Sequence, residues 1–387
     1  MAAQRSYTIA VMPGDGIGPE VLTSSLQVLQ TVTQMHGLEF NFVNYDYGAN
    51  LYAKTGRLIT PEDMDAIRSS SDAIFAGAFG LPDVRLPNGT EVGPQIVMRD
   101  YYQLFASLRL TKAFTGVPTR LKAASGREKG DLDILIIREL TEGMFAGMKD
   151  PVVYSDEAMS DRMTITRTVS TKLFRLAFSQ ARRRKEINNT MGRVTLLHKS
   201  NNLRSNGLLQ KVFWEIAALT ENSDIEAKEH YIDAGAMYFV TDPERYDVVV
   251  TENIFGDIIS DLAAGIVGGL GVAPSGDVNG PLAGSSSQSH ATTAEEKPFG
   301  LFQPSHGTAP DIMGKGFANP IATVLSAVMM LEWLAEVHDD SRCSDAADRL
   351  KAAVELYFTQ GPLTRDLGGR ANTNDVSQRL LELLNQA

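Results

Sequence analysis

An α/β fold is predicted for this chain, because short apolar runs alternate with segments that carry apolar residues at helical spacing. Most of the apolar runs are followed by a polar loop or a helix, as in a sheet covered by helices. A length of 387 residues exceeds one small core and suggests two or three domains.

The first predicted strand covers residues 7–12 and ends at Pro13-Gly14, and a predicted helix follows at 19–35. Dense apolar runs predict further strands at 71–77, 131–137, 193–197 and 246–251. Helices are predicted at 321–337, 351–358 and 376–385. In contrast, residues 276–298 have little apolar content, and we predict a long, mobile surface loop there.

The composition argues against several classes of protein. With 43% hydrophobic residues the chain is not disordered throughout, and no apolar run approaches the ~20 residues that cross a bilayer. A net charge of −11 argues against binding to nucleic acid or to an anionic membrane. The single cysteine, Cys343, excludes an intramolecular disulfide. Because the N-terminus shows no targeting pattern, we predict a cytoplasmic location.

A glycine-rich loop, Pro13-Gly-Asp-Gly-Ile-Gly-Pro-Glu20, separates the first predicted strand and helix. Its glycines allow the backbone to approach a ligand closely. The third glycine comes one residue too early for the G-x-G-x-x-G fingerprint of a Rossmann nucleotide site. Taken alone, the loop is equally compatible with tight packing and with ligand binding.

Three arginines are candidates for binding a polycarboxylate. Arg138 ends a predicted strand, where open α/β sheets bind ligands, and Arg99 and Arg109 flank residues 100–108. Guanidinium groups pair bidentately with carboxylates, so converging arginines suit such a substrate. Surface salt bridges are the alternative for Arg99 and Arg109.

Asp257 and Asp261 are four residues apart, on one face of the helix expected after residues 246–251. Apolar neighbours such as Ile259 predict that this helix is partly buried. Two close carboxylates repel unless a cation or proton lies between them, and Mg²⁺ or Mn²⁺ suits oxygen ligands. Two solvated aspartates are the alternative.

Lys199 follows the predicted strand at 193–197, and near a metal ion and arginines it suits a general base. An ordinary surface lysine is the alternative, and we expect His198 to pack or hydrogen-bond locally. The Gly- and Pro-rich segment 304–320 leads into a predicted helix, where backbone N–H groups can hold phosphates. A plain connecting loop is the alternative there.

Together these motifs resemble the β-decarboxylating dehydrogenases, which include isopropylmalate, isocitrate, homoisocitrate and tartrate/D-malate dehydrogenases. The resemblance covers nearly the whole chain. The matching segments follow the family's order and comprise the loop at 13–21, the pair Arg99 and Arg109, R-E-L-T at 138–141, K-x-N at 199–201, Asp257 with Asp261, and H-G-T-A-P-D at 306–311 through Asn319.

The resemblance implies a two-domain isopropylmalate/isocitrate dehydrogenase-like fold with a non-Rossmann NAD site. Residues 1–104 plus 268–387 would form a discontinuous cofactor-binding domain, and residues 105–267 an inserted substrate and dimerisation domain. It further implies a homodimer, in which Lys199 and Asp233 reach into the partner's active site.

The resemblance also implies roles for single residues. Arg99, Arg109 and Arg138 would hold the substrate carboxylates. Mg²⁺ or Mn²⁺, bound by Asp233, Asp257 and Asp261, would hold the 2-hydroxyl and its neighbouring carboxylate. Lys199 and Asp233 are the implied catalytic residues, and Lys199 would help to remove the hydroxyl proton as hydride passes to NAD. The implied cofactor residues are His306, Gly307, Thr308, Ala309, Asp311 and Asn319, with Asp311 at the position that favours NAD over NADP.

Phe145 departs from the family pattern, because the family's R-E-x-T-x-x-x-Y segment ends in a tyrosine that acts as general acid. General acid catalysis is worth about 10²–10⁴ in rate. Another donor (Tyr101, Tyr102 or water), a slow or incomplete reaction, and a non-catalytic regulatory paralogue are therefore the alternatives.

The predicted side-chain pocket is also unusual. Gln95 and Asn202 make it more polar than in isopropylmalate enzymes, and Gln303 replaces a glutamate near the nicotinamide. We predict an NAD- and metal-dependent enzyme that oxidatively decarboxylates a C3-substituted (2R)-malate, either 3-isopropylmalate or a close analogue. A tartrate/D-malate dehydrogenase, which the K-S-N motif favours, is the alternative.

Overall fold

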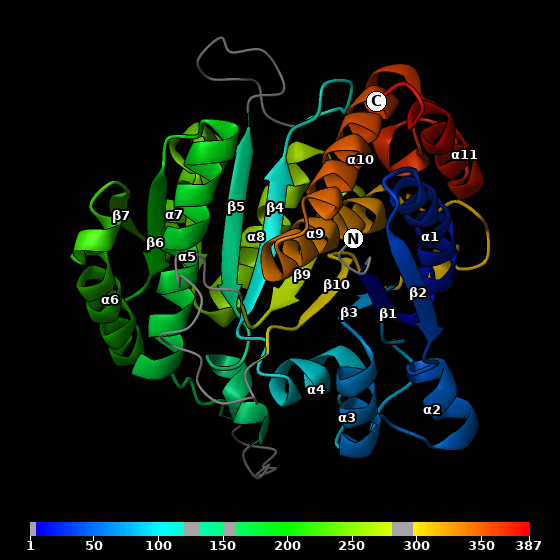
Figure 1. Cartoon of the computed structure of the whole chain (residues 1–387). Helices are drawn as coiled ribbons and strands as arrows, with labels where there is room; N and C mark the ends of the chain where they lie inside the picture. Colours follow the sequence, from blue (N-terminus) through cyan, green and yellow to red (C-terminus); the bar gives the residue numbers. More distant parts are fainter. Residues whose placement is uncertain (1–4, 120–131, 150–159, 281–296) are drawn as a thin grey trace.

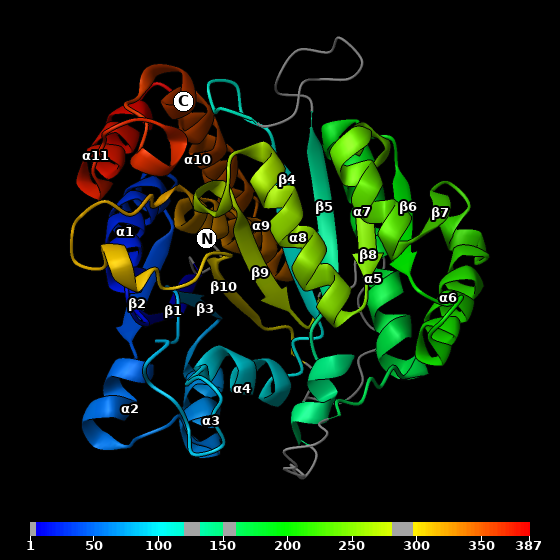
Figure 2. The ribbon, with the colours of Figure 1, turned by 180° about the vertical axis from the view of Figure 1, so that it is seen from behind.

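The computed structural model describes residues 5–119, 132–149, 160–280 and 297–387, and these residues form one large sheet with helices on both faces (Figures 1 and 2). The predicted α/β class is therefore confirmed. The described strands are β1 (Ser6–Met12), β2 (Glu39–Asn44), β3 (Ala73–Ala76), β4 (Ala106–Lys112), β5 (Asp133–Glu139), β6 (Arg193–His198), β7 (Glu226–Tyr231), β8 (Val248–Thr251), β9 (Pro274–Val278) and β10 (Gly300–Pro304).

The strands are ordered β2-β1-β3-β10-β9-β4-β5-β8-β6-β7. The first four are parallel to one another, and so are the last four. In the centre, β9 pairs antiparallel with β10 and with β4, and β4 pairs antiparallel with β5. The two parallel halves are thus joined by two strands that are far apart in the sequence.

The helices lie between and over these strands. They are α1 (Gly18–Met35), α2 (Ala49–Thr55), α3 (Pro61–Ser70), α4 (Pro94–Tyr101), α5 (Arg167–Asn188), α6 (Arg204–Ala217), α7 (Ile232–Thr241), α8 (Asn253–Val267), α9 (Ile321–His338), α10 (Ser341–Gln360) and α11 (Thr373–Leu383), with 3₁₀ turns η1 (Met144–Lys149) and η6 (Pro310–Ile312). The helix predicted at 351–358 is only the second half of α10, whose polar first turns Asp340 caps.

The hydrophobic cores differ between the two faces of the sheet. On one face a single core runs across both parallel halves, beneath α1, α5, α6, α9 and α10. On the other face there are two separate cores, one beneath α3 and α4 and one beneath α7 and α8. Figure 2 shows α8 in front of the central strands on this second face. Between the two cores, the central strands carry polar side chains, and these form the candidate site described below.

Helix α9 is apolar and long enough to cross a membrane by length and composition, but 72% of it is buried inside the protein. Ile321, Ala327 and Leu334 are fully buried, and the helix packs on β9 and β10. It is therefore a core helix of the fold.

The loop predicted at 276–298 is wrong at its start, because residues 276–278 belong to β9, a fully buried central strand. Residues 281–296 of that prediction lie outside the described residues. Ser275 and Gly276 carry no apolar side chains that would predict a strand from the sequence. This strand is buried because neighbouring elements cover it. The division of the chain into two domains stays a prediction.

Candidate active site

The candidate site begins with three polar side chains on adjacent central strands. Arg138 of β5 is opposite Ser107 of β4, and Ser107 is opposite Asp277 of β9. Partners opposite each other in a sheet point to the same face. Arg138 is 5% exposed, whereas Ser107 and Asp277 are 0% exposed. A buried row of an arginine, a serine and an aspartate thus crosses the middle of the sheet.

Two further arginines reach this row. Arg109 lies two residues after Ser107 and donates from Nε to the Ser107 hydroxyl over 3.0 Å. Arg99, from α4, donates from Nε to Oδ2 of Asp277 over 2.8 Å. The structure therefore brings the three predicted substrate arginines together, and surface salt bridging is excluded as the role of Arg109, which is 7% exposed.

Helix α8 covers this group. Arg138 donates to the side-chain oxygen of Asn253 from Nε over 3.0 Å and from Nη2 over 2.8 Å, and it pairs through Nη1 with Asp257. Gly256 allows this approach, because a Cβ there would lie 2.6 Å from Cγ of Arg138. Burial lowers the pKa of Arg138 to about 10, although Asp257 opposes the shift.

Asp257 and Asp261 fit a divalent cation by their donor chemistry. The pKa of Asp261 is raised, because the group is partly withdrawn from water and the Asp257 carboxylate repels its charge, while Arg109 acts in the opposite direction. A cation between the two carboxylates would relieve that repulsion. In the described part of this single chain, no three His, Cys, Asp or Glu side chains form a metal-binding group.

Lys199 and Asp233 form a second, separate pair. Lys199 follows β6, Asp233 lies in the first turn of α7, and the Lys199 Nζ is 2.7 Å from Oδ1 of Asp233. Their side chains are 26% and 68% exposed. The charges that act most strongly on Arg109 are those of Asp277, Arg99, Asp257 and Asp261. The third predicted metal ligand, Asp233, is not among these charges and pairs with Lys199 instead.

His198 has the local role that we expected. It is 1% exposed, its Nδ1 accepts from the backbone N–H of Ser200 over 3.3 Å, and burial lowers its pKa. Its ring contacts Tyr231 at a centroid distance of 5.3 Å. It packs beneath Lys199 and takes no direct part in the site.

Phe145 lies beside Arg138, whose guanidinium carbon is 5.7 Å from the centre of the phenyl ring. The position that carries a tyrosine in the family thus borders the arginine group. Two suggested substitute donors point elsewhere, because the hydroxyl of Tyr101 donates to Asp65 and that of Tyr102 to the backbone of Met64, both over 2.8 Å. The structure corrects the suggestion that either tyrosine replaces the missing one.

The two residues predicted to make the side-chain pocket polar differ in their surroundings. Gln95 is one helical turn before Arg99 in α4, on the same face, and its Oε1 is buried without a hydrogen-bond partner among the described residues. Asn202 is exposed in the turn after Lys199, whose backbone oxygen accepts from its N–H over 3.0 Å. Gln95 therefore adjoins the arginines, and Asn202 adjoins Lys199.

The predicted cofactor loop connects β10 to α9 and packs on the glycine-rich loop. The N–H of Ile17 donates to the backbone oxygen of Thr308 over 2.9 Å, and a Cβ at Gly16 would lie 2.1 Å from that oxygen. Packing is thus one role of the glycine-rich loop, and ligand binding by it stays a prediction. Asp15 strengthens the packing, because its buried carboxylate accepts from the backbone N–H groups of Ala49, Asn50 and Gly80.

The cofactor loop has features that fit a dinucleotide. Nε2 of His306 is buried and has no partner among the described residues. Ala309 has a φ of 39°, which bends the chain sharply before η6, and Asp311 in η6 is exposed. Asn319 accepts from the N–H of Ile321 over 3.0 Å and donates to Asp366 over 3.0 Å at the start of α9. Gly307 and Thr308 complete the loop.

Sequence reasoning missed Ser107 and Asp277, which anchor two of the arginines. The alternation of polar and apolar residues in Ser107-Leu-Arg-Leu110 is the signal that would have identified β4 and its polar face. Asp277 had no such signal, because it stands in a short strand without apolar alternation.

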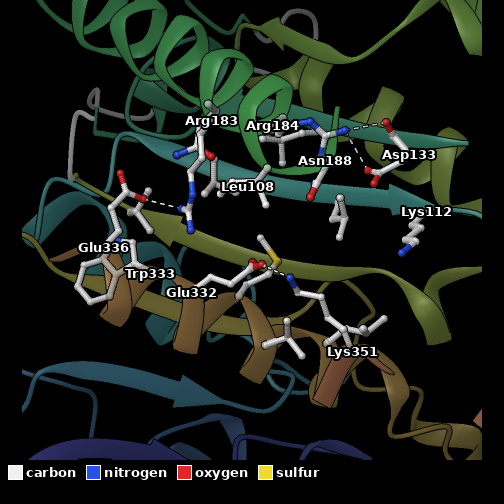
Figure 3. Close-up of a pocket in the computed structure, with 18 of the residues that line it drawn as sticks. Leu108, Lys112, Asp133, Arg183, Arg184, Asn188, Glu332, Trp333, Glu336 and Lys351 are labelled. Atoms are coloured by element: carbon white, nitrogen blue, oxygen red, sulfur yellow. Dashed lines mark hydrogen bonds and ion pairs between the residues drawn. The ribbon is translucent and has the colours of Figure 1, made fainter. Parts of the chain in front are cut away.

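A cavity of about 450 Å³ lies on the opposite face of the same strands, and Figure 3 shows its lining. Leu108 and Leu110 of β4 point into it, whereas Ser107 and Arg109 point to the site. At its rim, Arg183 of α5 pairs with Glu336 of α9 over 2.7 Å. None of the predicted site residues lines this cavity.

Comparisons with known proteins agree with this arrangement. A family model described as isocitrate/isopropylmalate dehydrogenase matches residues 8–380. A 3-isopropylmalate/3-methylmalate dehydrogenase of Methanocaldococcus jannaschii is 38% identical over 376 residues, which cover 97% of this chain and 98% of that protein. The 3-isopropylmalate dehydrogenase of Thermobifida fusca is 36% identical over 391 residues, with coverages of 98% and 99%.

Solved structures show the same likeness. The structure of isocitrate dehydrogenase from Methylococcus capsulatus has a TM-score of 0.80 at 31% identity. The match covers 98% of this chain and 100% of that enzyme's chain. An apo β-decarboxylating dehydrogenase from Thermococcus kodakarensis has a TM-score of 0.73 at 32% identity, with coverages of 98% and 96%. The chain belongs to the isocitrate/isopropylmalate dehydrogenase family, whose members act on hydroxy acids, and it is a decarboxylating dehydrogenase, an oxidoreductase.

Proposed function

We propose that this enzyme oxidises and decarboxylates a (2R)-malate with a C3 substituent, 3-isopropylmalate or a close analogue, using NAD and Mg²⁺ or Mn²⁺. The observation that carries the proposal is the convergence of Arg99, Arg109 and Arg138 on one face of the sheet. Arg99 and Arg109 are both anchored through Nε, so the outer nitrogens of their guanidinium groups remain for substrate carboxylates.

The divalent cation, when bound, would polarise the 2-hydroxyl and the adjacent carboxylate. Asp257 and Asp261 of one copy and Asp233 of a second copy would hold it. Lys199 of the second copy, as the neutral amine, would take the hydroxyl proton, and Asp233, 2.7 Å from its Nζ, would stabilise the ammonium that forms.

A homodimer is part of the proposal, in which the Lys199–Asp233 pair enters the arginine group of the second copy. The packed helices α7 and α8 leave large apolar side chains in water, with Met237 52%, Val240 49% and Ile258 62% exposed. An exposed apolar patch of this kind suits an interface between two copies. The cytoplasmic location stays a prediction.

The cofactor loop would bind NAD. His306 donates from Nδ1 to the backbone oxygen of Gly307 over 2.9 Å, so its unpartnered Nε2 offers an acceptor to the dinucleotide, and the backbone N–H groups around Gly307 and Thr308 offer donors. The exposed carboxylate of Asp311 would accept from the two ribose hydroxyls and repel a 2′-phosphate.

We predict that Asp311→Ala weakens the preference for NAD over NADP by about tenfold, because the repulsion of the 2′-phosphate is lost. The measurement is the ratio of kcat/KM for the two cofactors at fixed substrate and Mn²⁺. An unchanged ratio would remove the role given to Asp311. Thr308→Ser, which keeps the loop and its charge, is the control and should leave the ratio as it is.

One observation favours a second candidate, a tartrate/D-malate dehydrogenase. The buried, unpartnered Oε1 of Gln95 lies on the Arg99 face of α4 and would be satisfied by a hydroxyl group. A substrate with a C3 hydroxyl supplies that group, whereas a branched alkyl group leaves it without a donor.

The test uses the purified full-length chain with Mn²⁺, NAD and a panel of (2R)-malates that bear hydrogen, hydroxyl, methyl, ethyl or isopropyl at C3. NADH and CO₂ are measured together. We expect equal amounts of both and the highest kcat/KM with an alkyl substituent. A maximum with tartrate or D-malate would establish the second candidate. No NADH with any member would identify a non-catalytic paralogue.

A further inference from the structure

Asp277 is a fully buried carboxylate that belongs to none of the predicted binding roles. It is 0% exposed in β9. It accepts from Nε of Arg99 over 2.8 Å and from the hydroxyl of Ser107 over 2.6 Å. Burial alone would raise its pKa, but Arg99, Arg109 and the Ser107 hydroxyl outweigh burial and lower it. The group is therefore a fixed negative charge behind the arginines.

Ser107 connects Asp277 to the second arginine, Arg109. Its hydroxyl donates to Oδ1 of Asp277 and accepts from Nε of Arg109 over 3.0 Å. Because a hydroxyl has one proton, donation to the carboxylate fixes its lone pairs towards Arg109. Asp277 thus orients Arg99 directly and Arg109 through one hydroxyl, and both guanidinium groups are held by the nitrogen nearest the side-chain stem.

The charge balance follows from the same contacts. Two arginines share one buried carboxylate, so the pair has one net positive charge in a region with little water to screen it. This single net positive charge is balanced by one carboxylate of the substrate. An additional carboxylate at C3 of the substrate would give the group of Arg99, Arg109, Asp277 and bound carboxylate a net negative charge.

We propose that Asp277 and Ser107 are positioning residues of the substrate site, which fix Arg99 and Arg109 for one carboxylate and select against a malate with a charged C3 substituent. This inference rests on the proposed function and adds to it the charge class of the substrate. In this proposal Ser107 orients Arg109. Asp277 orients both arginines and also selects the charge of the C3 substituent.

The orientation is tested with Ser107→Ala, which removes the link and leaves all charges in place. We expect KM for the preferred C3-alkyl malate to rise about tenfold with kcat within about threefold, because binding is lost before chemistry is affected. Ser107→Thr keeps the hydroxyl and should restore KM. An unchanged KM in Ser107→Ala, or no rescue by threonine, would overturn the orienting role.

A matched control separates this effect from general destabilisation. Asp247 is 1% exposed and accepts from Nε of Arg184 over 2.9 Å, in a buried pair that resembles Arg99–Asp277 but lies outside the site. Asp247→Asn should lower the melting temperature as Asp277→Asn does and leave KM unchanged. A KM that rises equally in both variants would reduce Asp277 to a structural residue.

The charge selection is tested with Asp277→Asn. We measure the ratio of kcat/KM for isocitrate to that for the preferred C3-alkyl malate, and binding of both to the Mg²⁺-loaded protein by calorimetry. The ratio should rise at least about tenfold in Asp277→Asn and stay unchanged in Ser107→Ala. An unchanged ratio in Asp277→Asn overturns the selection. If the wild type turns over no malate, the proposed function fails instead.

Discussion

Phe145 shows how one side chain can decide the reaction without changing the binding site. Its ring lies against the guanidinium of Arg138, as an aromatic ring near a cation does, yet a phenyl ring has no proton to give. The described tyrosines nearby, Tyr101 and Tyr102, have hydroxyls committed to α3. Neither of these two tyrosine hydroxyls is therefore directed at Phe145.

Phe145→Tyr is predicted to raise the rate of decarboxylation, because it adds one hydroxyl where the family has its general acid. We expect an increase of up to about 10²-fold, the lower end of what general acid catalysis supplies. The measurement is the rate of CO₂ release at saturating substrate, compared with that of the wild type. Phe145→Leu, which removes the ring, is the control. An unchanged or slower rate in Phe145→Tyr would mean that the pocket is built around a different donor.

Asp277 also gives the enzyme a defined acid sensitivity. Its folded pKa lies below the ordinary value of 3.8, so its pairing stabilises the fold above that value and is lost as the pH falls through the folded pKa. Removing one partner of a buried pair costs about 3–5 kcal/mol. We predict that the free energy of unfolding of Asp277→Asn falls short of the wild type by about this amount at pH 7 and at pH 5.

The difference should shrink only below about pH 4, since only there does the wild-type carboxyl begin to lose its charge. Urea unfolding of both proteins between pH 7 and pH 3 provides the measurement. A difference that already shrinks between pH 7 and pH 5 would show that the arginines do not hold the carboxyl ionised.

Among the elements, the glycine-rich loop supports the cofactor loop from behind. Gly16 has a φ of 58°, and its missing side chain makes room for the backbone oxygen of Thr308. Gly16→Ala is predicted to raise KM for NAD about tenfold and KM for the malate much less, because the Cβ pushes the cofactor loop away. Steady-state kinetics with each substrate varied in turn provides the test.

Gly56 at the end of α2 provides the matched control for that variant. It has a φ of 72°, but a Cβ at this position would meet no atom within 4 Å. Gly56→Ala therefore carries the same backbone strain, about 1 kcal/mol, without the clash. Its KM for NAD should equal that of the wild type. Equal effects of the two variants would assign the loss to strain and contradict the supporting role of the loop.

Elements with a strong local pattern can be predicted from sequence, and elements whose burial comes from neighbours cannot. The predicted bounds of β1 and α9 are close to the observed ones, because their apolar residues are dense and continuous. The sequence of β9 resembles a loop, since Ser275, Gly276 and Asp277 are polar or small and are buried only by β4, β10 and α9. The residues with chemical motifs can be recognised in the sequence, and the alternation around Ser107 predicts its strand, but Asp277 has no such signal.

For the whole molecule, the proposed homodimer would make catalysis a property of two chains, because Lys199 and Asp233 would enter the partner's site. We predict that Lys199→Ala and Arg138→Ala are each inactive as homodimers but recover activity when co-expressed. One of the two sites in each mixed dimer is then intact, which gives the isolated mixed dimer about half of wild-type activity. Activity per chain after co-purification with two different tags is the measurement.

Co-expression of Lys199→Ala with Asp233→Ala is the control, because every mixed site then lacks one residue of the same contributed pair. This combination should recover no enzymatic activity. Absence of recovery in the first combination as well would place Lys199 in the site of its own chain and contradict the shared arrangement.

The antiparallel centre of the sheet also determines when the site is completed during synthesis. Asp277 follows Ser107 by 170 residues, and β4 pairs with β9 directly. Bringing such distant segments together requires loop entropy to be lost before any contact forms. The arginine-bearing strand therefore leaves the ribosome well before the carboxylate that orients it. Until β9 arrives, β4 is an exposed strand edge with an uncompensated Arg109, and the nascent chain has its catalytic cations before it has their anchor.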